Sequence, residues 1–268
     1  MKYKIIALDI DGTLTNSKKE ITKRTYDALI DYQDRGGIIV LASGRPTPGL
    51  KKYVNWLHLD NYGGYVLSYN GAHIENVKTG EVVHDQTVPN EYIPSLYEFA
   101  VKNDLGIVTY KDNFALCGNG QDEFLKYEAN LNGLTCKDVD DFPNYISFPV
   151  NKLLMTAEGD MLARKERELA KQYDARLSIY RSEDFFLEIM PKNVDKAQSL
   201  LHLLNALDLT QENLIACGDG HNDKTMIAYA GLGVAMDNAK DEVKRAANVI
   251  AKSNDEDGVA LIVEEYCN

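Results

Sequence analysis

The sequence of 268 residues predicts an α/β fold, in which a Rossmann-like parallel sheet with helices on both faces is interrupted by an inserted α+β domain. Three observations support this prediction. Short, almost continuous apolar runs alternate with a helix-length segment at the start of the chain, which indicates buried parallel strands. The same kind of apolar run returns near the end of the chain. Between these parts lies a stretch in which short helices and strands are separated by turn signals.

The first part of the chain is predicted to alternate strands with a helix. Residues 22–35 have the spacing of an amphipathic helix, with Thr22 as a candidate N-cap and Gly36 as a stop signal. A hairpin is expected at residues 74–83. The candidate buried strands are residues 3–8, 38–42 and 65–69. This order indicates a βαβ unit, whose strands are parallel.

The middle of the chain has a different pattern, with turn signals such as Asn119 followed by Gly120. Its candidate helices are residues 90–103, 121–131 and 160–172, and its candidate strands are residues 107–110, 114–117, 152–157, 177–181 and 185–189. Such a series indicates an α+β unit with a largely antiparallel sheet.

Near the end of the chain the buried-strand pattern returns. The candidate strands are residues 214–217, 233–235 and 249–251, and the candidate helices are residues 195–206, 222–229, 239–247 and 257–266. The simplest account is one discontinuous core domain, residues 1–85 and 189–268, interrupted by a cap domain, residues 86–188. The two crossings, near residues 84–88 and 187–191, are the expected hinges.

Composition limits the classes of function. Because 41 acidic residues outweigh 29 basic ones, the formal net charge is −12, which argues against a nucleic-acid-binding surface. The longest aliphatic runs, such as residues 38–42, are far shorter than the roughly 18 apolar residues that a membrane span needs. Neither a membrane partner nor a signal peptide is expected. Four scattered cysteines favour reduced thiols, and we expect a cytoplasmic monomer or weak homo-oligomer.

Polar residues follow the predicted strands, at the edge where open parallel sheets bind ligands. The first strand is followed by Asp9, Asp11 and Gly12, the second by Ser43, Gly44 and Arg45, and the late strand by Asp219, His221, Asn222 and Asp223, while Lys196 begins a predicted helix. Because parallel strands end at one edge, four carboxylates, one lysine and one serine are expected to converge there.

Four crowded carboxylates repel one another unless a cation joins them. Carboxylate and carbonyl oxygens are ligands typical of Mg²⁺. A site of Mg²⁺, Lys196, Ser43 and turn amides suits a phosphoryl group. Asp9 and Asp11 are two residues apart, so in an extended strand end their side chains point the same way. That arrangement allows a division of labour between a nucleophile and a general acid and base.

Each motif alone also has an ordinary structural explanation. Residues 9–13 have the composition of a capped turn, Ser43 that of a loop residue, and Lys196 that of a solvated helix face. Their conjunction, in this order and at strand and helix ends, favours a functional site over these separate explanations.

These segments together resemble the haloacid dehalogenase-like hydrolase superfamily. The matching segments are residues 9–13, 41–45 and 218–223, together with Lys196. Residues 43–46 and 70–72 are typical of its bacterial sugar-phosphate phosphatase branch, which carries a large inserted α/β cap. The chain departs from this branch at residues 191–197, because relatives usually have glycine on either side of the lysine motif.

The resemblance implies a Mg²⁺-dependent phosphatase that hydrolyses small phosphorylated metabolites, such as sugar phosphates, through an aspartyl-phosphate. Asp9 would attack phosphorus, and Asp11 would protonate the leaving alcohol and later deprotonate the attacking water. Asp9, the backbone carbonyl of Asp11, and Asp219 would hold the metal ion, and Asp223 would act through water or from behind these ligands. The cap would close over the core and set the choice of substrate.

The resemblance also implies phosphoryl-binding groups. Ser43, Asn222 and Lys196 would hold phosphoryl oxygens, and the amides of Gly12 and Gly44 would add donors. Arg45 is a candidate substrate contact or the partner of a cap carboxylate, with a surface ion pair as the ordinary alternative. His221 is a spacer or a substrate contact.

Two other functions use the same residues. A phosphomutase would form the same aspartyl-phosphate but return the phosphoryl group to a sugar. A non-catalytic phosphosugar-binding regulator would bind the ligand without turnover. Release of inorganic phosphate without a bisphosphate activator separates a phosphatase from a phosphomutase. The intact set of Asp9, Asp11, Lys196 and Asp219 argues against a protein without turnover.

Overall fold

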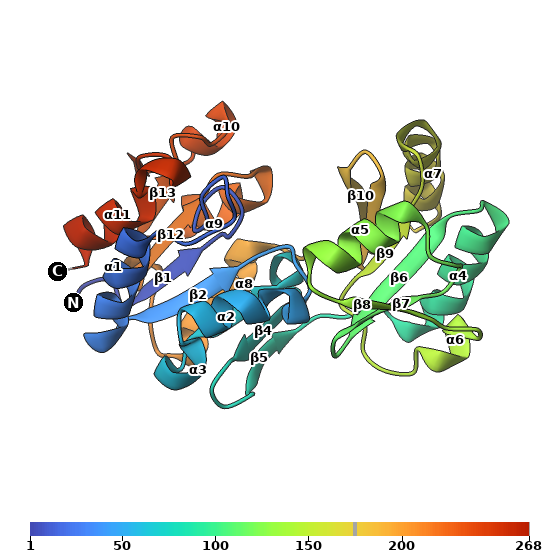
Figure 1. Cartoon of the computed structure of the whole chain (residues 1–268), viewed down its shortest axis with the longest axis horizontal. Helices are drawn as coiled ribbons and strands as arrows, with labels where there is room; N and C mark the ends of the chain where they lie inside the picture. Colours follow the sequence, from blue (N-terminus) through green and yellow to red (C-terminus); the bar gives the residue numbers. More distant parts are fainter. Residues whose placement is uncertain (174–175, 268) are drawn as a thin grey trace. The chain divides into compact units, whose positions relative to one another are not determined.

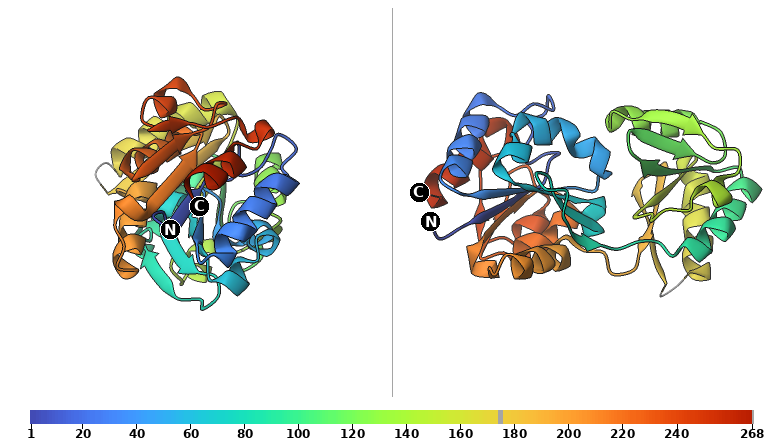
Figure 2. Two further views of the ribbon diagram at one scale, coloured as in Figure 1. Left: turned by 90° about the vertical axis from the view of Figure 1, so that its left-hand side faces the viewer. Right: turned by 90° about the horizontal axis from the view of Figure 1, so that it is seen from below.

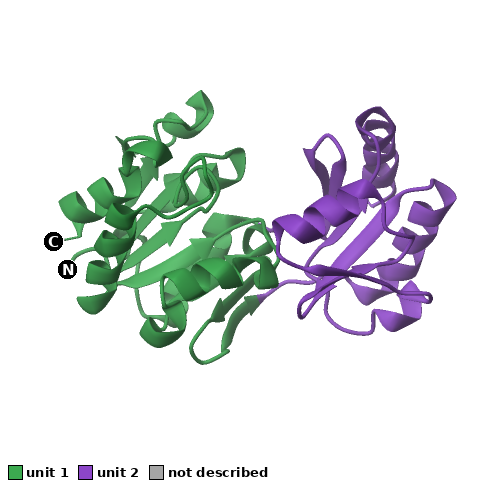
Figure 3. Cartoon of the chain, viewed as in Figure 1, with its two compact units in different colours: residues 1–84, 195–268 green, residues 85–194 purple. Residues whose placement is uncertain are grey.

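The computed structural model describes residues 1–173 and 176–267, which divide into two compact units (Figure 3). Unit 1 comprises Met1–His84 and Asp195–Asn268, and unit 2 comprises Asp85–Val194. The first boundary lies one residue before the position expected from the sequence. The second lies after residue 194 rather than after residue 188, because the last strand of unit 2 continues to Pro191.

Unit 1 is built on a sheet of eight strands in the order β14-β13-β12-β1-β2-β3-β4-β5 (Figure 1). β1 pairs in parallel with both β2 and β12, whereas β3 and β4 are antiparallel. The strands are β1 (Ile5–Leu8), β2 (Ile38–Ala42), β3 (Tyr65–Ser68), β4 (His73–Asn76), β5 (Val82–Asp85), β12 (Leu214–Gly218), β13 (Leu232–Ala235) and β14 (Val249–Ile250).

Helices cover both faces of this sheet, as the right-hand view of Figure 2 shows. In β1, Ile6 and Leu8 belong to one apolar cluster, and Ile5 and Ala7 belong to the other. The first cluster includes α1 (Lys23–Asp34), α2 (Lys51–Trp56), α3 (Leu59–Tyr62) and α11 (Gly258–Tyr266), and the second includes α8 (Lys196–Ala206), α9 (Lys224–Tyr229) and α10 (Asp241–Lys244). The predicted fold class is confirmed.

Some elements of unit 1 differ from the prediction. α2 and α3 were not expected, because segments of six and four residues are too short to show helical periodicity. The helix expected at residues 239–247 is shorter in the structure, where only α10 is helical. The residues after it form turns in which an amide bonds to the carbonyl oxygen three residues earlier, such as Ala246 N to Val243 O.

Unit 2 has a sheet of six strands in the order β10-β11-β9-β6-β7-β8, which is antiparallel except between β7 and β8. Its strands are β6 (Gly106–Lys111), β7 (Phe114–Cys117), β8 (Thr135–Asp138), β9 (Leu153–Thr156), β10 (Leu177–Glu183) and β11 (Phe186–Pro191), and its helices are α4 (Ile93–Lys102), α5 (Glu123–Leu131), α6 (Phe142–Tyr145) and α7 (Gly159–Gln172). α4, α6 and α7 share one apolar core with the sheet. The largely antiparallel sheet agrees with the prediction, although β8 and α6 were not foreseen.

The helices of residues 1–173 and 176–267 include none with both the length and the apolar character that crossing a bilayer requires. The four cysteines carry free thiols.

Candidate active site

The candidate site lies where the strand order of unit 1 reverses. From β1 the chain builds the sheet outward through β2 and β3, and from β12 it builds in the opposite direction through β13 and β14. Open parallel sheets bind ligands at such a switch point, beyond the carboxyl ends of the strands. Asp9 follows β1 and Asp219 follows β12, and the bond from Asp9 N to Cys217 O (3.0 Å) holds the two strand ends together.

Lys196 is buried at the centre of this site. Asp195 caps the start of α8 by accepting bonds from the amides of Ala197 and Gln198, so the lysine projects from the first turn of the helix. Its Nζ donates to Asp9 Oδ1 (2.8 Å), Asp223 Oδ1 (2.6 Å) and the carbonyl oxygen of Ala42 (2.8 Å). These bonds use all three donors of the ammonium group. The alternative of a solvated lysine is therefore wrong.

Three carboxylates form a group that could hold a metal ion. Asp9, Asp219 and Asp223 each offer an oxygen, and these oxygens lie within 4.8 Å of one another. Asp223 Oδ2 accepts the amides of Asp219 (3.0 Å) and Gly220 (2.8 Å), and Thr13 donates to Asp219 Oδ1 (2.8 Å). The aspartates are thus fixed by the backbone and by a neighbouring hydroxyl.

The charges of this group fit a divalent cation. Burial and the neighbouring charge of Asp223 raise the pKa of Asp9 to about 8, despite its bond to Lys196. Burial also raises the pKa of Asp219 to about 6, although the bond from Thr13 opposes the shift. When all three carboxyls are ionised, they and the ammonium group leave an excess of two negative charges, which one Mg²⁺ would balance.

Gly12 brings the turn after β1 close to the three carboxylates that could hold a metal ion. Its φ of 83° is left-handed, and a Cβ at this position would collide with the carboxylate of Asp219. Its carbonyl oxygen accepts a bond from Asn238 Nδ2 (2.8 Å). A glycine is therefore required here by both backbone conformation and space.

Asp11 lies in a different environment from Asp9. Lys19 Nζ donates to Asp11 Oδ1 (2.8 Å), and Arg45 donates twice to Asp11 Oδ2 (2.8 and 3.0 Å). Burial alone would raise the pKa of Asp11, but Arg45 and Lys19 outweigh it and hold the pKa below its ordinary value. Arg45 thus forms an ion pair with a carboxylate of unit 1, which is closest to the ordinary alternative considered from the sequence, and its role as a substrate contact stays a prediction.

The predicted phosphoryl-binding residues lie on loops beside these aspartates. Ser43 is buried at the end of β2, and its Oγ accepts the amide of Arg45 (3.2 Å). Asn222 is exposed and donates from Nδ2 to Asn70 Oδ1 (3.0 Å). Gly44 lies next to the same Asn70, because a Cβ on Gly44 would be 3.0 Å from Asn70 Oδ1.

His221 lies at the exposed rim of the same loop. Its side chain is 74% exposed, and Nδ1 lies 3.0 Å from Glu242 Oε1. The histidine therefore has a partner within unit 1. Its described bonds include no direct contact with Asp9, Asp219 or Asp223. Its assignment as a substrate contact remains a prediction.

Three neighbours of the site had no role in the sequence prediction. Thr13 and Asn70 fall inside the quoted motifs, so their position was a signal that could have identified them. Lys19 follows the motif by several residues on a loop and has a left-handed φ of 61°, and no pattern in the sequence indicates its contact with Asp11.

The departure at residues 191–197 is resolved by the backbone. Asn193 has a φ of 62°, in the left-handed region that asparagine tolerates better than most residues with a side chain. The loop can therefore make a glycine-like turn without glycine, and Lys196 still reaches Asp9.

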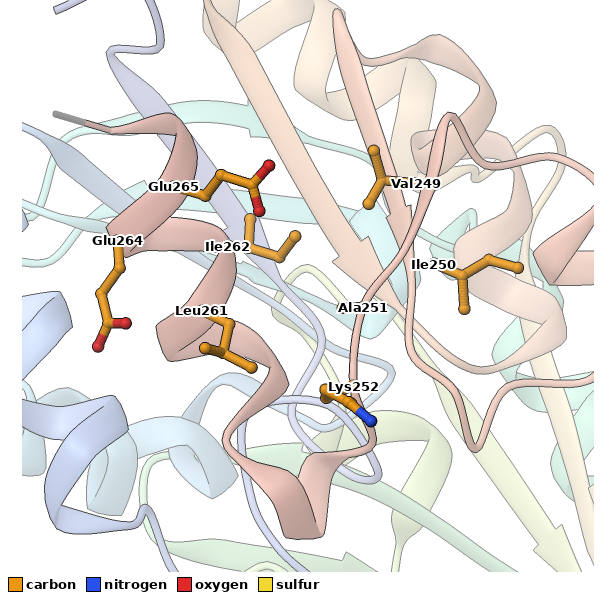
Figure 4. Close-up of a pocket in the computed structure, with 8 residues that line it drawn as sticks. All are labelled: Val249, Ile250, Ala251, Lys252, Leu261, Ile262, Glu264 and Glu265. Atoms are coloured by element: carbon orange, nitrogen blue, oxygen red, sulfur yellow. The ribbon is translucent and has the colours of Figure 1, made fainter.

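A surface groove elsewhere in unit 1 does not share these features. Its volume is about 400 Å³, and it is lined by residues 249–252, 261, 262, 264 and 265 (Figure 4). The lining contains none of the predicted site residues. Glu264 in this groove is already paired with Arg24 (2.7 Å).

The chain is similar to known proteins over almost its whole length. The family model described as haloacid dehalogenase-like hydrolase matches residues 6–263. A Bacillus subtilis protein named "Putative phosphatase YxeH" is 35% identical over 266 residues, with 98% of each chain covered. Another from Bacillus subtilis, the 5-amino-6-(5-phospho-D-ribitylamino)uracil phosphatase YcsE, is 28% identical, with 98% of this chain and 95% of the relative covered.

A solved structure is similar along almost the whole chain. The crystal structure of a haloacid dehalogenase-like hydrolase from Bacteroides thetaiotaomicron is 45% identical, covers 98% of this chain and 99% of its own, and superimposes with a TM-score of 0.95. The range matched by the family model, residues 6–263, includes the segments at the sheet edge. The chain therefore belongs to the haloacid dehalogenase-like hydrolase family and is a phosphatase enzyme of that family.

Proposed function

We propose that the protein is a Mg²⁺-dependent phosphatase that hydrolyses small phosphorylated metabolites, with sugar phosphates as the favoured class, through an aspartyl-phosphate. The observation that carries this proposal is the contact of Asp9 with the buried Lys196, beside two further carboxylates. A carboxylate held at a strand end by an ammonium group is suited to attack phosphorus, because the lysine offsets the charge that would repel a phosphoryl group.

Asp9 and Asp11 divide the reaction between them. A carboxylate oxygen of Asp9 forms a bond to phosphorus while the bond to the leaving oxygen breaks, and Asp11 gives that oxygen its proton. Water then attacks phosphorus, Asp11 takes a proton from the water, and the bond between phosphorus and Asp9 breaks. Inorganic phosphate leaves, and both aspartates return to their first states.

The contacts of Asp11 favour the second step as they stand. Arg45 and Lys19 hold this carboxyl in its anionic form, which is the form that accepts a proton from water. Acting as an acid in the first step requires these contacts to loosen, since only then can the pKa of Asp11 rise. An incoming phosphoryl group carries the negative charge that would compete for Arg45.

The chain's own residues supply a binding site for the metal ion and the phosphoryl group. Asp9, Asp219 and the backbone carbonyl of Asp11 would hold Mg²⁺, with Asp223 behind them. When bound, the ion neutralises negative charge and polarises the phosphoryl oxygens. Ser43, Lys196, Asn222 and the amides of Gly12 and Gly44 would hold phosphoryl oxygens.

Unit 2 is proposed to set substrate choice. The name of the 28% identical Bacillus subtilis phosphatase specifies a phosphate on a ribityl chain, which supports a small polyhydroxylated substrate. A cytoplasmic location and a monomeric or weakly oligomeric state stay predictions.

A phosphate-release screen tests the proposal. Sugar phosphates, pyridoxal phosphate and flavin mononucleotide are incubated with the protein, with and without Mg²⁺. We expect release from at least one sugar phosphate, only with Mg²⁺ and without a bisphosphate activator. Absence of release from every substrate in the presence of Mg²⁺ would overturn the proposal. Release that requires a bisphosphate activator would point to a phosphomutase.

A further inference from the structure

Three consecutive residues after β3 have left-handed backbone. The φ angles are 52° for Tyr69, 54° for Asn70 and 108° for Gly71. Glycine adopts this region readily, whereas a residue with a side chain pays free energy to do so, tyrosine more than asparagine. Two adjacent strained residues persist only where their surroundings impose the conformation, and such strain is concentrated at functional sites.

Hydrogen bonds on both sides impose the conformation. The amide of Asn70 donates to the carbonyl oxygen of Ser43 (2.9 Å), and the amide of Tyr69 donates to that of Arg45 (3.0 Å). On the other side, Ser199 Oγ of α8 donates to the carbonyl oxygen of Gly71 (2.7 Å). The corner therefore connects the loop after β2 to the helix that carries Lys196.

The side chain of Asn70 contacts two other parts of the same site. Its Oδ1 accepts the bond from Asn222 Nδ2 (3.0 Å) and lies where a Cβ on Gly44 would be only 3.0 Å away. One amide group thus lies between the loop after β2 and the loop after β12. An exposed asparagine such as Asn222 has little else in its described contacts to fix its rotamer.

We propose that Asn70 is a positioning residue for phosphoryl binding. Its side chain orients the amide of Asn222, and its left-handed main chain fixes the loop that carries Ser43 and Gly44. This inference rests on the proposed function, because it assigns those partners to the phosphoryl group. Since every substrate shares that group, loss of the Asn70 side chain affects all phosphate monoesters alike.

A double-mutant cycle with Asn222 tests the inference. Asn70→Gly keeps the left-handed backbone available and deletes only the amide. We expect it to lower kcat/KM about ten-fold for each monoester and to raise the inhibition constant of inorganic phosphate by a similar factor, as for the loss of one hydrogen bond. Because Asn70 acts through Asn222, the variant with both Asn70→Gly and Asn222→Ala should be no slower than Asn222→Ala alone.

A matched control separates this role from backbone strain. Asp208 also has left-handed backbone (φ 53°) in an exposed turn of unit 1, and Asp208→Gly should leave kcat/KM unchanged. If Asn70→Gly does not fold, Asn70→Ser removes the same amide, and Asp208→Ser is then the control for the strain that serine adds in left-handed backbone. Unchanged phosphate inhibition, or multiplicative effects in the double variant, would show that the inference is wrong. A wild-type protein that hydrolyses no monoester would instead refute the proposed function.

Discussion

At the scale of single residues, the site gives two aspartates opposite electrostatic surroundings. Asp9 faces two other carboxylates, and burial together with their charge raises its pKa. Asp11 faces Arg45 and Lys19, which lower its pKa. These two shifts run against the proposed roles as the residues stand, because a nucleophile must be ionised and a general acid must hold a proton. Binding of Mg²⁺ beside Asp9 would lower the pKa of this carboxyl, and a phosphoryl group that competes for Arg45 would raise the pKa of Asp11.

Replacement of each aspartate by asparagine should separate these roles. Asp9→Asn removes the attacking oxygen anion, so we expect no turnover. Asp11→Asn removes the proton carrier and should slow both half-reactions by roughly 100-fold or more. Stopped-flow measurement of alcohol release and of phosphate release follows the two steps separately. Normal activity of the Asp9→Asn protein would disprove its assignment as nucleophile.

The sequence indicates the acidic residues of the site better than their partners. Asp9, Asp219 and Lys196 belong to motifs at strand and helix ends, and the structure brings them together. Lys19 could not be predicted, because its contact with Asp11 depends on the path of a loop that carries no motif. The pairing of Arg45 was also undetermined, since a long side chain can reach several carboxylates and only the fold selects one.

At the scale of elements, the turns after the strands are as constrained as the catalytic side chains. Gly12→Ala would force a side chain into left-handed backbone and against the carboxylate of Asp219. We expect a large loss of kcat/KM and weaker Mg²⁺ binding, measured by titration of activity and by calorimetry. Gly36→Ala is the matched control, because Gly36 is left-handed (φ 87°) but has open space around it. Equal losses of activity in both variants would contradict this explanation.

Unit 2 contains a buried ion pair whose loss should lower the free energy of unfolding. Lys152 Nζ lies 3.3 Å from Glu188 Oε1, both side chains are less than 10% exposed, and Tyr180 donates a further bond to Glu188. Lys152→Met leaves the Glu188 carboxylate buried without this partner, so we expect the free energy of unfolding to fall by about 3–5 kcal/mol. Chemical denaturation measures the change.

An exposed pair provides the comparison for this prediction. Lys23 pairs with Asp27 on α1, and its side chain is 85% exposed. Lys23→Met should change the free energy of unfolding by less than about 1 kcal/mol. If Lys152→Met were as mild as Lys23→Met, the buried pair would not contribute to the stability of unit 2.

The elements that the sequence predicts best are those with a continuous apolar run or a strong helical period. The apolar run of β1 is buried on both faces of the sheet and was predicted within two residues, as was α1 with its Thr22 cap. α3 and β8 have four residues each, which is too few to show a period, and unlike β1 they contain no continuous apolar run. Their formation is decided by packing and by strand pairing, which involve residues distant in the sequence.

At the scale of the whole molecule, the net charge of −12 and the phosphoryl site are compatible because the positive charge is local. Lys196, Lys19 and Arg45 supply three cationic groups beside the aspartates of one sheet edge. The acidic excess elsewhere is compatible with a solvated surface. The carboxylates inside the site carry negative charge that its cationic side chains do not balance. The stability of the molecule should therefore depend on both pH and Mg²⁺.

The sign of that dependence follows from the raised pKa of the site carboxyls. Asp219 ordinarily titrates near 3.8 but has a pKa of about 6 in the metal-free fold, so the fold binds this proton more tightly than the unfolded chain does. This contribution to stability is complete below about pH 4 and is lost as the pH rises through 6, and Asp9 extends the loss toward about pH 8. Mg²⁺ binds the deprotonated carboxylates, so its effect has the opposite sign.

We therefore expect saturating Mg²⁺ to raise Tm more at pH 8 than at pH 5. Calorimetric scans at both pH values, with Mg²⁺ or with a chelator, measure this difference directly. The Asp219→Asn variant is the control, because it lacks a carboxyl that titrates and should bind Mg²⁺ weakly, so its Tm should respond little to the ion at either pH. An equal Mg²⁺-dependent rise of Tm in the wild-type protein at both pH values would contradict the proposed coupling. The carboxyls would then titrate independently of metal binding, and the ion would be held elsewhere.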